Sequence, residues 1–143
     1  MATMVSLLVM GCAGDGLQND QMLRGFNALQ HKNVGWDNPA ARKSVNKLAS
    51  MGSNAVIFIP FLEQSTASSL EVRKSAAVTD AQLQAAVRYA HDVGLKVTIK
   101  PQILIPGSWP GAINHSDHYS WKAWFSSYSK RMIECARFAS GLG

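Results

Sequence analysis

A continuous apolar run at residues 54–62 restricts the fold more than any other feature of this sequence. The run reads Asn-Ala-Val-Ile-Phe-Ile-Pro-Phe-Leu and does not alternate between apolar and polar residues. A strand that is covered on both faces in a parallel sheet has this pattern, whereas a half-exposed strand alternates. The run begins two residues after Met51-Gly52, which ends a segment of helical spacing. This short helix-to-strand connection predicts a βαβ unit.

The remaining elements repeat the same order. We expect a strand at 22–29, a helix that begins at Asn38-Pro39, a polar loop at 63–78, a helix from the capping box Thr79–Gln82 to Val93-Gly94, a strand at 95–99 and a last helix from about Ser120. This β-α-β-α-β-α order predicts an α/β fold, a parallel sheet with flanking helices. Three strands are too few for a closed eight-stranded barrel. We therefore expect the first three βα units of a (β/α)8 TIM barrel, truncated at Gly143.

Composition and charge narrow the classes of protein. A chain of 143 residues with 47% hydrophobic and 16% charged residues is typical of one ordered domain. The net charge of +5 comes from Lys and Arg residues that are scattered along the chain. Nucleic-acid-binding surfaces usually gather such residues in one run or on one face, so we expect no nucleic-acid partner. Nucleotide-binding Gly-x-Gly-x-x-Gly and serine-hydrolase Gly-x-Ser-x-Gly motifs are both absent from the sequence.

The first 21 residues form a separate unit. Apolar residues 4–10 lead into Val-Met-Gly-Cys12, which resembles a bacterial lipobox, and a short polar tether follows. In that pattern the cysteine carries the lipid, so we expect lipidation of Cys12 and a secreted or cell-envelope protein held at the membrane by a lipid anchor alone. The alternative is an N-terminal coil or a misassigned start, because no Lys or Arg precedes the apolar run.

Polar and aromatic residues follow the predicted strands, where β/α enzymes place their binding groups. Strand 95–99 ends in Lys-Pro-Gln and opens into a loop that holds a Trp between two Pro-Gly pairs. An exposed indole can stack on a sugar ring, and amide or ammonium groups can bind sugar hydroxyls. The candidate sugar-binding residues are Trp36, Gln64, Lys100, Gln102 and Trp109. The alternative for each is a structural role: a rim salt bridge for Lys100 and a loop anchor for the tryptophans.

For the other polar and aromatic candidates, a structural or solvent-exposed role is commoner than a functional one. Glu63 follows the second strand, but a solvated loop carboxylate is commoner than a lone general base. His115 and His118 lie three residues apart without a third ligand, so we expect surface histidines and no metal or other cofactor. The aromatic stripe of the last helix predicts core packing against the sheet; it comprises Trp121, Trp124, Phe125 and Tyr128.

From about Arg24 onward, the ordered motifs resemble those of glycoside hydrolase family 113, the endo-β-1,4-mannanases and their relatives. The motifs are Arg24-Gly-Phe-Asn, residues 48–56, 64–69 and 78–83, Ala90-His-Asp-Val-Gly-Leu-Lys-Val-Thr-Ile-Lys-Pro, Gly-Ser-Trp-Pro-Gly111 and Trp124-Phe-x-x-Tyr. In that family a His usually follows Lys-Pro, whereas this chain has Gln102. A glutamine keeps the hydrogen-bonding capacity of that position but cannot titrate.

The resemblance implies hydrolysis of a β-linked, mannan-like polysaccharide by two glutamates on the fourth and a later strand. Both would lie beyond Gly143, so the resemblance assigns no catalytic residue here and implies an inactive fragment. The rival interpretation is a non-catalytic, glycan-binding envelope lipoprotein. A third is a half-barrel that associates with itself, because unpaired strand edges favour association.

Overall fold

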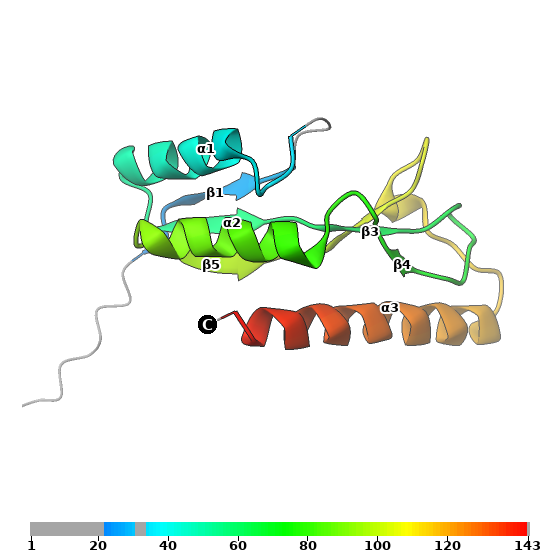
Figure 1. Ribbon diagram of the computed structural model, residues 1–143. Helices are drawn as coiled ribbons and strands as arrows, with labels where there is room; N and C mark the ends of the chain where they lie inside the picture. Colours follow the sequence, from blue (N-terminus) through cyan, green and yellow to red (C-terminus); the bar gives the residue numbers. More distant parts are fainter. Residues whose placement is uncertain (1–21, 31–33, 143) are drawn as a thin grey trace, which may run out of the picture.

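The computed structural model describes residues 22–30 and 34–142, which form two small sheets and three α-helices (Figure 1). Cys12 and the predicted tether lie outside the described residues. The elements are β1 (Gly25–Ala28), α1 (Pro39–Ser50), β2 (Ala55–Phe58), β3 (Phe61–Glu63), β4 (Arg73–Lys74), α2 (Asp80–Asp92), β5 (Lys96–Ile99), β6 (Gln102–Leu104), a 3-10 turn at Pro110–Ala112 and α3 (His118–Ser140).

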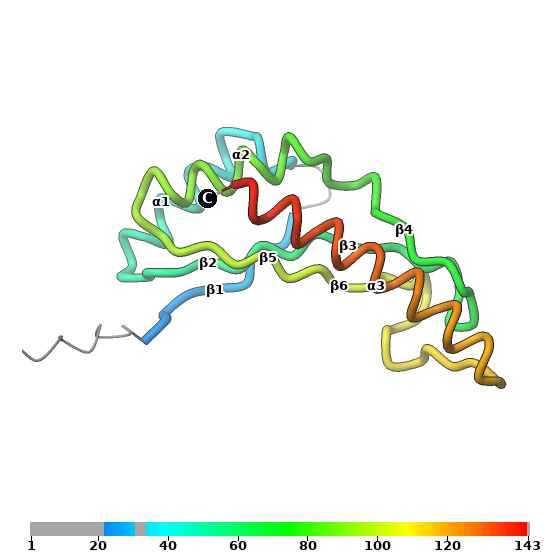
Figure 2. Tube along the Cα trace, turned by 90° about the horizontal axis from the view of Figure 1, so that it is seen from below, coloured from blue at the N-terminus to red at the C-terminus, as the bar shows by residue number. Residues whose placement is uncertain are grey.

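The main sheet has the order β1-β2-β5, and all its strands are parallel. Phe58 at the end of β2 is level with Ala28 of β1 and Ile99 of β5, so the carboxyl ends of the three strands meet at one edge. Helices α1 and α2 lie on the same side of this sheet (Figure 2). The parallel sheet with flanking helices is therefore confirmed, with three βα units in the order that a TIM barrel requires.

The core lies between the main sheet and its helices. Phe58 is 1% exposed and meets the indole of Trp36 edge to face, with the ring centroids 5.3 Å apart. Val56 on the same side of β2 is fully buried, and Ala86 and Ala90 supply small side chains where α2 approaches the strand. The strand interior is covered here by helices, which explains its unbroken apolar sequence.

The predicted helix boundaries follow their capping signals. The Thr79 side chain accepts a hydrogen bond from the backbone N–H of Gln82, whose side chain accepts one from Thr79, so the capping box is present. The Asn38 side chain caps α1 by accepting a hydrogen bond from the backbone N–H of Ala40, with Pro39 in the first turn. Gly94 follows α2 at a φ of 77°, a conformation that L side chains rarely adopt.

The strand predicted over 54–62 is wrong in its extent, because a proline divides it into two strands, and a second proline divides the neighbouring strand at the same level. Pro60 separates β2 from β3, and Pro101 separates β5 from β6 in the same way. Hydrogen bonds cross the breaks: the Lys100 N–H donates to Phe58 O over 2.9 Å, and the Gln102 N–H donates to Pro60 O over 3.1 Å. Proline has no N–H for a sheet ladder and fixes its own φ, so each strand is interrupted while the pairing resumes beyond it.

Beyond the prolines, the strands form a second sheet of order β4-β3-β6, which we call the extension. Strand β3 pairs with β6 in parallel and with β4 in antiparallel orientation. The polar loop predicted at 63–78 therefore contains a strand, Arg73–Lys74. A two-residue strand is too short to show any periodicity in the sequence.

Helix α3 covers one face of the extension. Trp124 is 6% exposed and packs in a cluster with Leu62 and Val72. The aromatic stripe therefore packs mainly on the extension, whereas only the far end of the helix, at Phe138, touches the core of the main sheet. The prediction of core packing is wrong for Phe125, because 54% of this side chain is exposed. In the described part of the chain, no helix has both the length and the hydropathy needed to cross a membrane.

Candidate substrate-binding face

The extension has two faces, and α3 covers only one. Leu62 and its register partner Ile103 pack with the aromatic side chains of α3. Successive side chains of a strand point to opposite faces. The adjacent residues Gln102, Leu104 and Glu63 therefore lie on the other face, which we call the open face. The extension directly follows the carboxyl ends of β2 and β5, the position at which barrel enzymes bind their ligands.

The open face carries a groove of about 340 Å³. Arg73 of β4 is level with Glu63 of β3, and Glu63 is level with Leu104 of β6, so all three strands contribute to it. Charged and apolar groups thus stand side by side, as in many sugar and small-molecule sites. The groove is lined by Glu63, Gln64, Ser65, Glu71, Arg73, Leu104 and Pro106.

Two of the five candidate residues, Lys100 and Gln102, are exposed at the start of the open face. Their backbones are fixed by the hydrogen bonds to Phe58 and Pro60 described above, and Gln102 is level with Phe61. Lys100 is one residue beyond the end of β5, as the sequence predicts. Both side chains are accessible, and their contact with sugar stays a prediction.

Trp109 is also accessible, with 67% of its surface exposed. Its ring lies over Gly111, where a Cβ atom would collide with the six-membered ring of the indole. The loop thus supports one part of the ring and leaves the rest open to solvent. An aromatic ring held in this way can stack on an apolar sugar face with little loss of side-chain entropy.

Replacing Gly111 with alanine is expected to push the Trp109 ring off the loop. Because the ring is exposed, the midpoint of urea unfolding should change little, by less than about 0.5 kcal/mol in stability. The fluorescence of the chain and its affinity for a manno-oligosaccharide should both fall, and Ser108→Ala is the control at an exposed position of the same loop. An unchanged emission spectrum in Gly111→Ala would contradict this arrangement.

Gln64 and Trp36 are both buried and make contacts within the protein. Gln64 is 1% exposed; its Nε2 donates to the carbonyl oxygens of Thr66 and Ala67, and its Oε1 accepts from Trp124 Nε1 over 2.8 Å. Trp36 is 4% exposed and packs on Phe58. Gln64 therefore folds the loop that borders the groove, and Trp36 fills the core. Both side chains are buried, and their contact with sugar stays a prediction.

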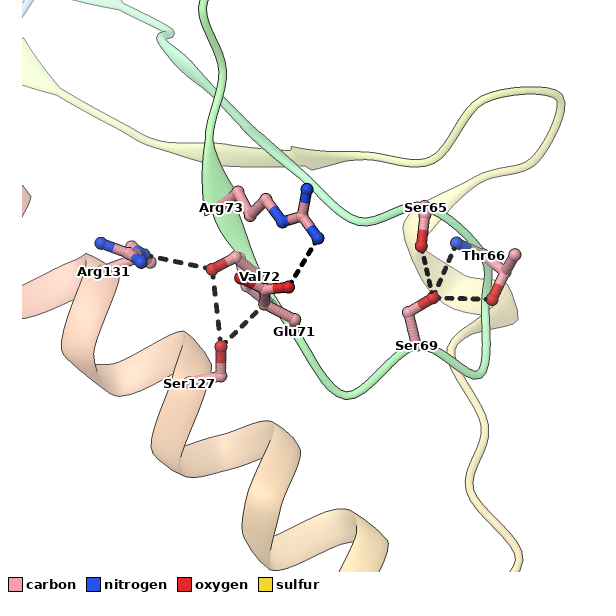
Figure 3. Close-up of polar contacts among 8 residues, drawn as sticks. All are labelled: Ser65, Thr66, Ser69, Glu71, Val72, Arg73, Ser127 and Arg131. Atoms are coloured by element: carbon pink, nitrogen blue, oxygen red, sulfur yellow. Dashed lines mark hydrogen bonds and ion pairs between the residues drawn. The ribbon is translucent and has the colours of Figure 1, made fainter.

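Glu71 and Arg73 also line the groove, and no motif in the sequence marks them as site residues. Arg73 Nη2 and Glu71 Oε2 form an ion pair of 2.7 Å beside the groove (Figure 3). The hydrogen bond from Arg73 lowers the pKa of the Glu71 carboxyl, and the same bond raises the pKa of the Arg73 guanidinium. Both groups are thus charged at neutral pH. Their alternation with buried Val72 covers only three residues, which is too short a pattern to mark a strand or a site in the sequence.

The remaining candidates have clear positions. His115 is buried, not at the surface as predicted: 8% of it is exposed, and its ring meets Trp121 edge to face at 4.8 Å. His118 is exposed, and within the described ranges no three metal-ligating side chains come together. Glu63 accepts a hydrogen bond from the Ser75 hydroxyl. Cys135 is half-buried, and burial raises the pKa of its thiol.

Comparison with solved structures extends this picture. A GH113 β-1,4-mannanase has 29% sequence identity and a TM-score of 0.70 over 82% of this chain and 41% of its own. A second structure, a complex of a GH113 β-1,4-mannanase, gives 30% identity and a TM-score of 0.67 over 80% of this chain and 40% of its own. The β-mannanase AaManA from Alicyclobacillus acidocaldarius, in complex with ManMIm, has 29% sequence identity and a TM-score of 0.70 over 82% of this chain and 40% of its own.

The chain therefore spans about two fifths of the length of these mannanases. No curated protein matches it. The sequence model of Glycoside Hydrolase Family 113 matches residues 25–143, which include every strand and helix described above. On this match and the shared fold, the chain belongs to glycoside hydrolase family 113.

Proposed function

We propose that this chain forms one wall of the substrate cleft of a glycoside hydrolase that acts on β-linked, mannan-like polysaccharide. The observation that carries the proposal is the exposure of Lys100 and Gln102 on the open face, and of Trp109 in the loop after β6, beyond the carboxyl ends of the strands of a family 113 fold. The solved relatives are mannanases, and one holds the ligand ManMIm. Lys100 and Gln102 would bind hydroxyl groups, and Trp109 would stack on a sugar ring.

We further propose that the 143-residue polypeptide has no hydrolytic activity by itself. A retaining glycosidase needs two carboxyl groups about 5–5.5 Å apart across the scissile bond. Of the two carboxylates in the groove, Glu63 is engaged by Ser75 and Glu71 by Arg73, and the mannanases are more than twice as long as the stretch matched here.

A hydrolysis assay tests both parts. The 143-residue chain should release no reducing sugar from β-1,4-mannan, whereas it should bind manno-oligosaccharides in isothermal titration. Trp109→Ala should weaken that binding, and Phe125→Ala, an exposed aromatic change on α3, should leave it unchanged. Release of reducing sugar by the short chain would contradict its inactivity. Failure to bind any oligosaccharide would contradict the proposal that the chain forms a wall of the substrate cleft.

The alternative, a glycan-binding envelope lipoprotein, depends on the lipobox-like sequence at Cys12. We propose that Cys12 is lipidated and anchors the protein at the cell envelope. Expression in a bacterium with labelled palmitate should label the parent chain and Cys135→Ala, but not Cys12→Ala. Equal labelling of the two variants, or none of the parent, would contradict the anchor. If Cys12 is lipidated but the chain binds no glycan, both the proposed cleft wall and the glycan-binding lipoprotein are contradicted, and only the lipid anchor is supported.

We also propose that the main sheet promotes self-association. Among the described residues, β1 and β5 each have one edge without a strand partner. Phe26 on β1 is 50% exposed, which adds apolar surface beside its edge. Unpaired edges are ready templates for another chain. Sedimentation should show a dimer or larger species that shifts toward monomer on dilution; a monomer at every concentration would contradict it.

A further inference from the structure

We propose that the groove on the open face is a second sugar subsite, separate from Trp109, in which Arg73 and Glu71 bind the hydroxyl groups of one hexose unit. The inference rests on the proposed function, because it assigns a further unit of the same polysaccharide. The volume of about 340 Å³ lies within the usual range of ligand pockets, roughly 300–1,000 Å³. A single hexose therefore matches the groove better than a larger ligand does.

The chemistry of the lining matches a pyranose. A sugar unit has hydroxyl groups that both donate and accept, around an apolar C–H face. Arg73 has a planar guanidinium with five N–H donors, of which the ion pair with Glu71 uses one, and the carboxylates of Glu71 and Glu63 accept. Leu104, which is 43% exposed, and Pro106 supply apolar surface beside these groups.

The groove is held in place from behind. Val72, between the two charged residues, is fully buried; its N–H donates to Ser127 Oγ over 2.9 Å, and its carbonyl accepts from Arg131 Nε over 3.1 Å (Figure 3). The polar loop on the other side is closed by Ser69 Oγ, which lies 2.7 Å from Ser65 Oγ and 2.8 Å from Thr66 Oγ1. A site whose backbone is already ordered loses less entropy when it binds a ligand.

The ion pair between Arg73 and Glu71 contributes little to the stability of the fold. The side chains of Arg73 and Glu71 are 70% and 59% exposed, and exposed ion pairs add little to stability. Residue 73 can therefore be changed without loss of the fold, and an effect on affinity would report binding. Arg73 is also not a member of the aromatic cluster that supports α3, to which this strand contributes Val72.

The test is titration of the full 143-residue chain with β-1,4-manno-oligosaccharides of two to six units, by calorimetry. Arg73→Met keeps the length of the stem and removes the guanidinium. Because a hydrogen bond to a charged group contributes more than a neutral one, affinity for five and six units should fall about tenfold. Affinity for two units, which Trp109 can hold alone, should stay within about twofold. Arg137→Met makes the same change on exposed α3 and should match the parent.

Leu104→Ala gives a second measurement in the same groove and should also weaken binding of long oligosaccharides selectively. Circular dichroism confirms that each variant is folded. Parent-like affinity of Arg73→Met and Leu104→Ala at every length, with weakened binding by Trp109→Ala, would overturn the subsite and leave the proposed function intact. No binding of any oligosaccharide by the parent chain would contradict the proposed function and the subsite with it.

Discussion

Replacing Trp124 with alanine is expected to lower the free energy of unfolding by about 3–5 kcal/mol. The indole is 6% exposed, packs with Leu62 and Val72, and stacks on the Tyr128 ring with centroids 5.2 Å apart. Its removal opens a cavity between α3 and the extension. It also leaves the buried Oε1 of Gln64 without its donor, which adds to the cost.

Urea unfolding followed by far-UV circular dichroism measures this change. Trp124→Phe keeps most of the volume but has no N–H, so it isolates the hydrogen bond to Gln64 at about 1–3 kcal/mol. The control is the next residue on the same helix: Phe125→Ala removes a ring that is 54% exposed and should cost much less. Equal losses for the two alanine variants would contradict the assignment of Trp124 as the link between α3 and the extension.

Replacing Phe58 with alanine should be equally severe, again about 3–5 kcal/mol. Phe58 is 1% exposed at the end of β2 and supports the indole of Trp36 from the side. Whole domains are commonly stable by only about 5–15 kcal/mol, so this variant should be partly unfolded at 37 °C.

Phe26→Ala is the matched control, because the same ring is removed from the neighbouring strand, where 50% of it is exposed. Its unfolding midpoint should stay close to that of the parent. Thermal unfolding followed by the near-UV signal distinguishes the two positions. A Phe58 variant as stable as the Phe26 variant would show that β2 is not the centre of the core.

The main sheet could be predicted from the sequence because each of its signals is local. The apolar run places β2, although the strand ends earlier than the run, and the capping box at Thr79 and the glycine stop at Gly94 mark the two ends of α2. The exposed Trp109 follows in the same way from its own loop of Pro and Gly.

The extension could not be predicted, because its pairing is not local. Strand β4 has two residues and is defined by its partner β3, ten residues earlier in the chain. The buried state of Gln64 depends on Trp124, 60 residues away, and no pattern near Gln64 distinguishes a loop anchor from a sugar ligand. The prolines at 60 and 101 were the available signal, since each interrupts a strand at the level where the extension begins.

The most direct test of the open face as a wall of a mannan cleft is a nuclear magnetic resonance titration with β-1,4-mannohexaose. The indole N–H signal of exposed Trp109 and the amide signals of Lys100 and residues 102–104 should shift together and saturate, while the indole signals of buried Trp36 and Trp124 stay in place. Shifts confined to the exposed side of α3, or no shift at millimolar oligosaccharide, would contradict the account.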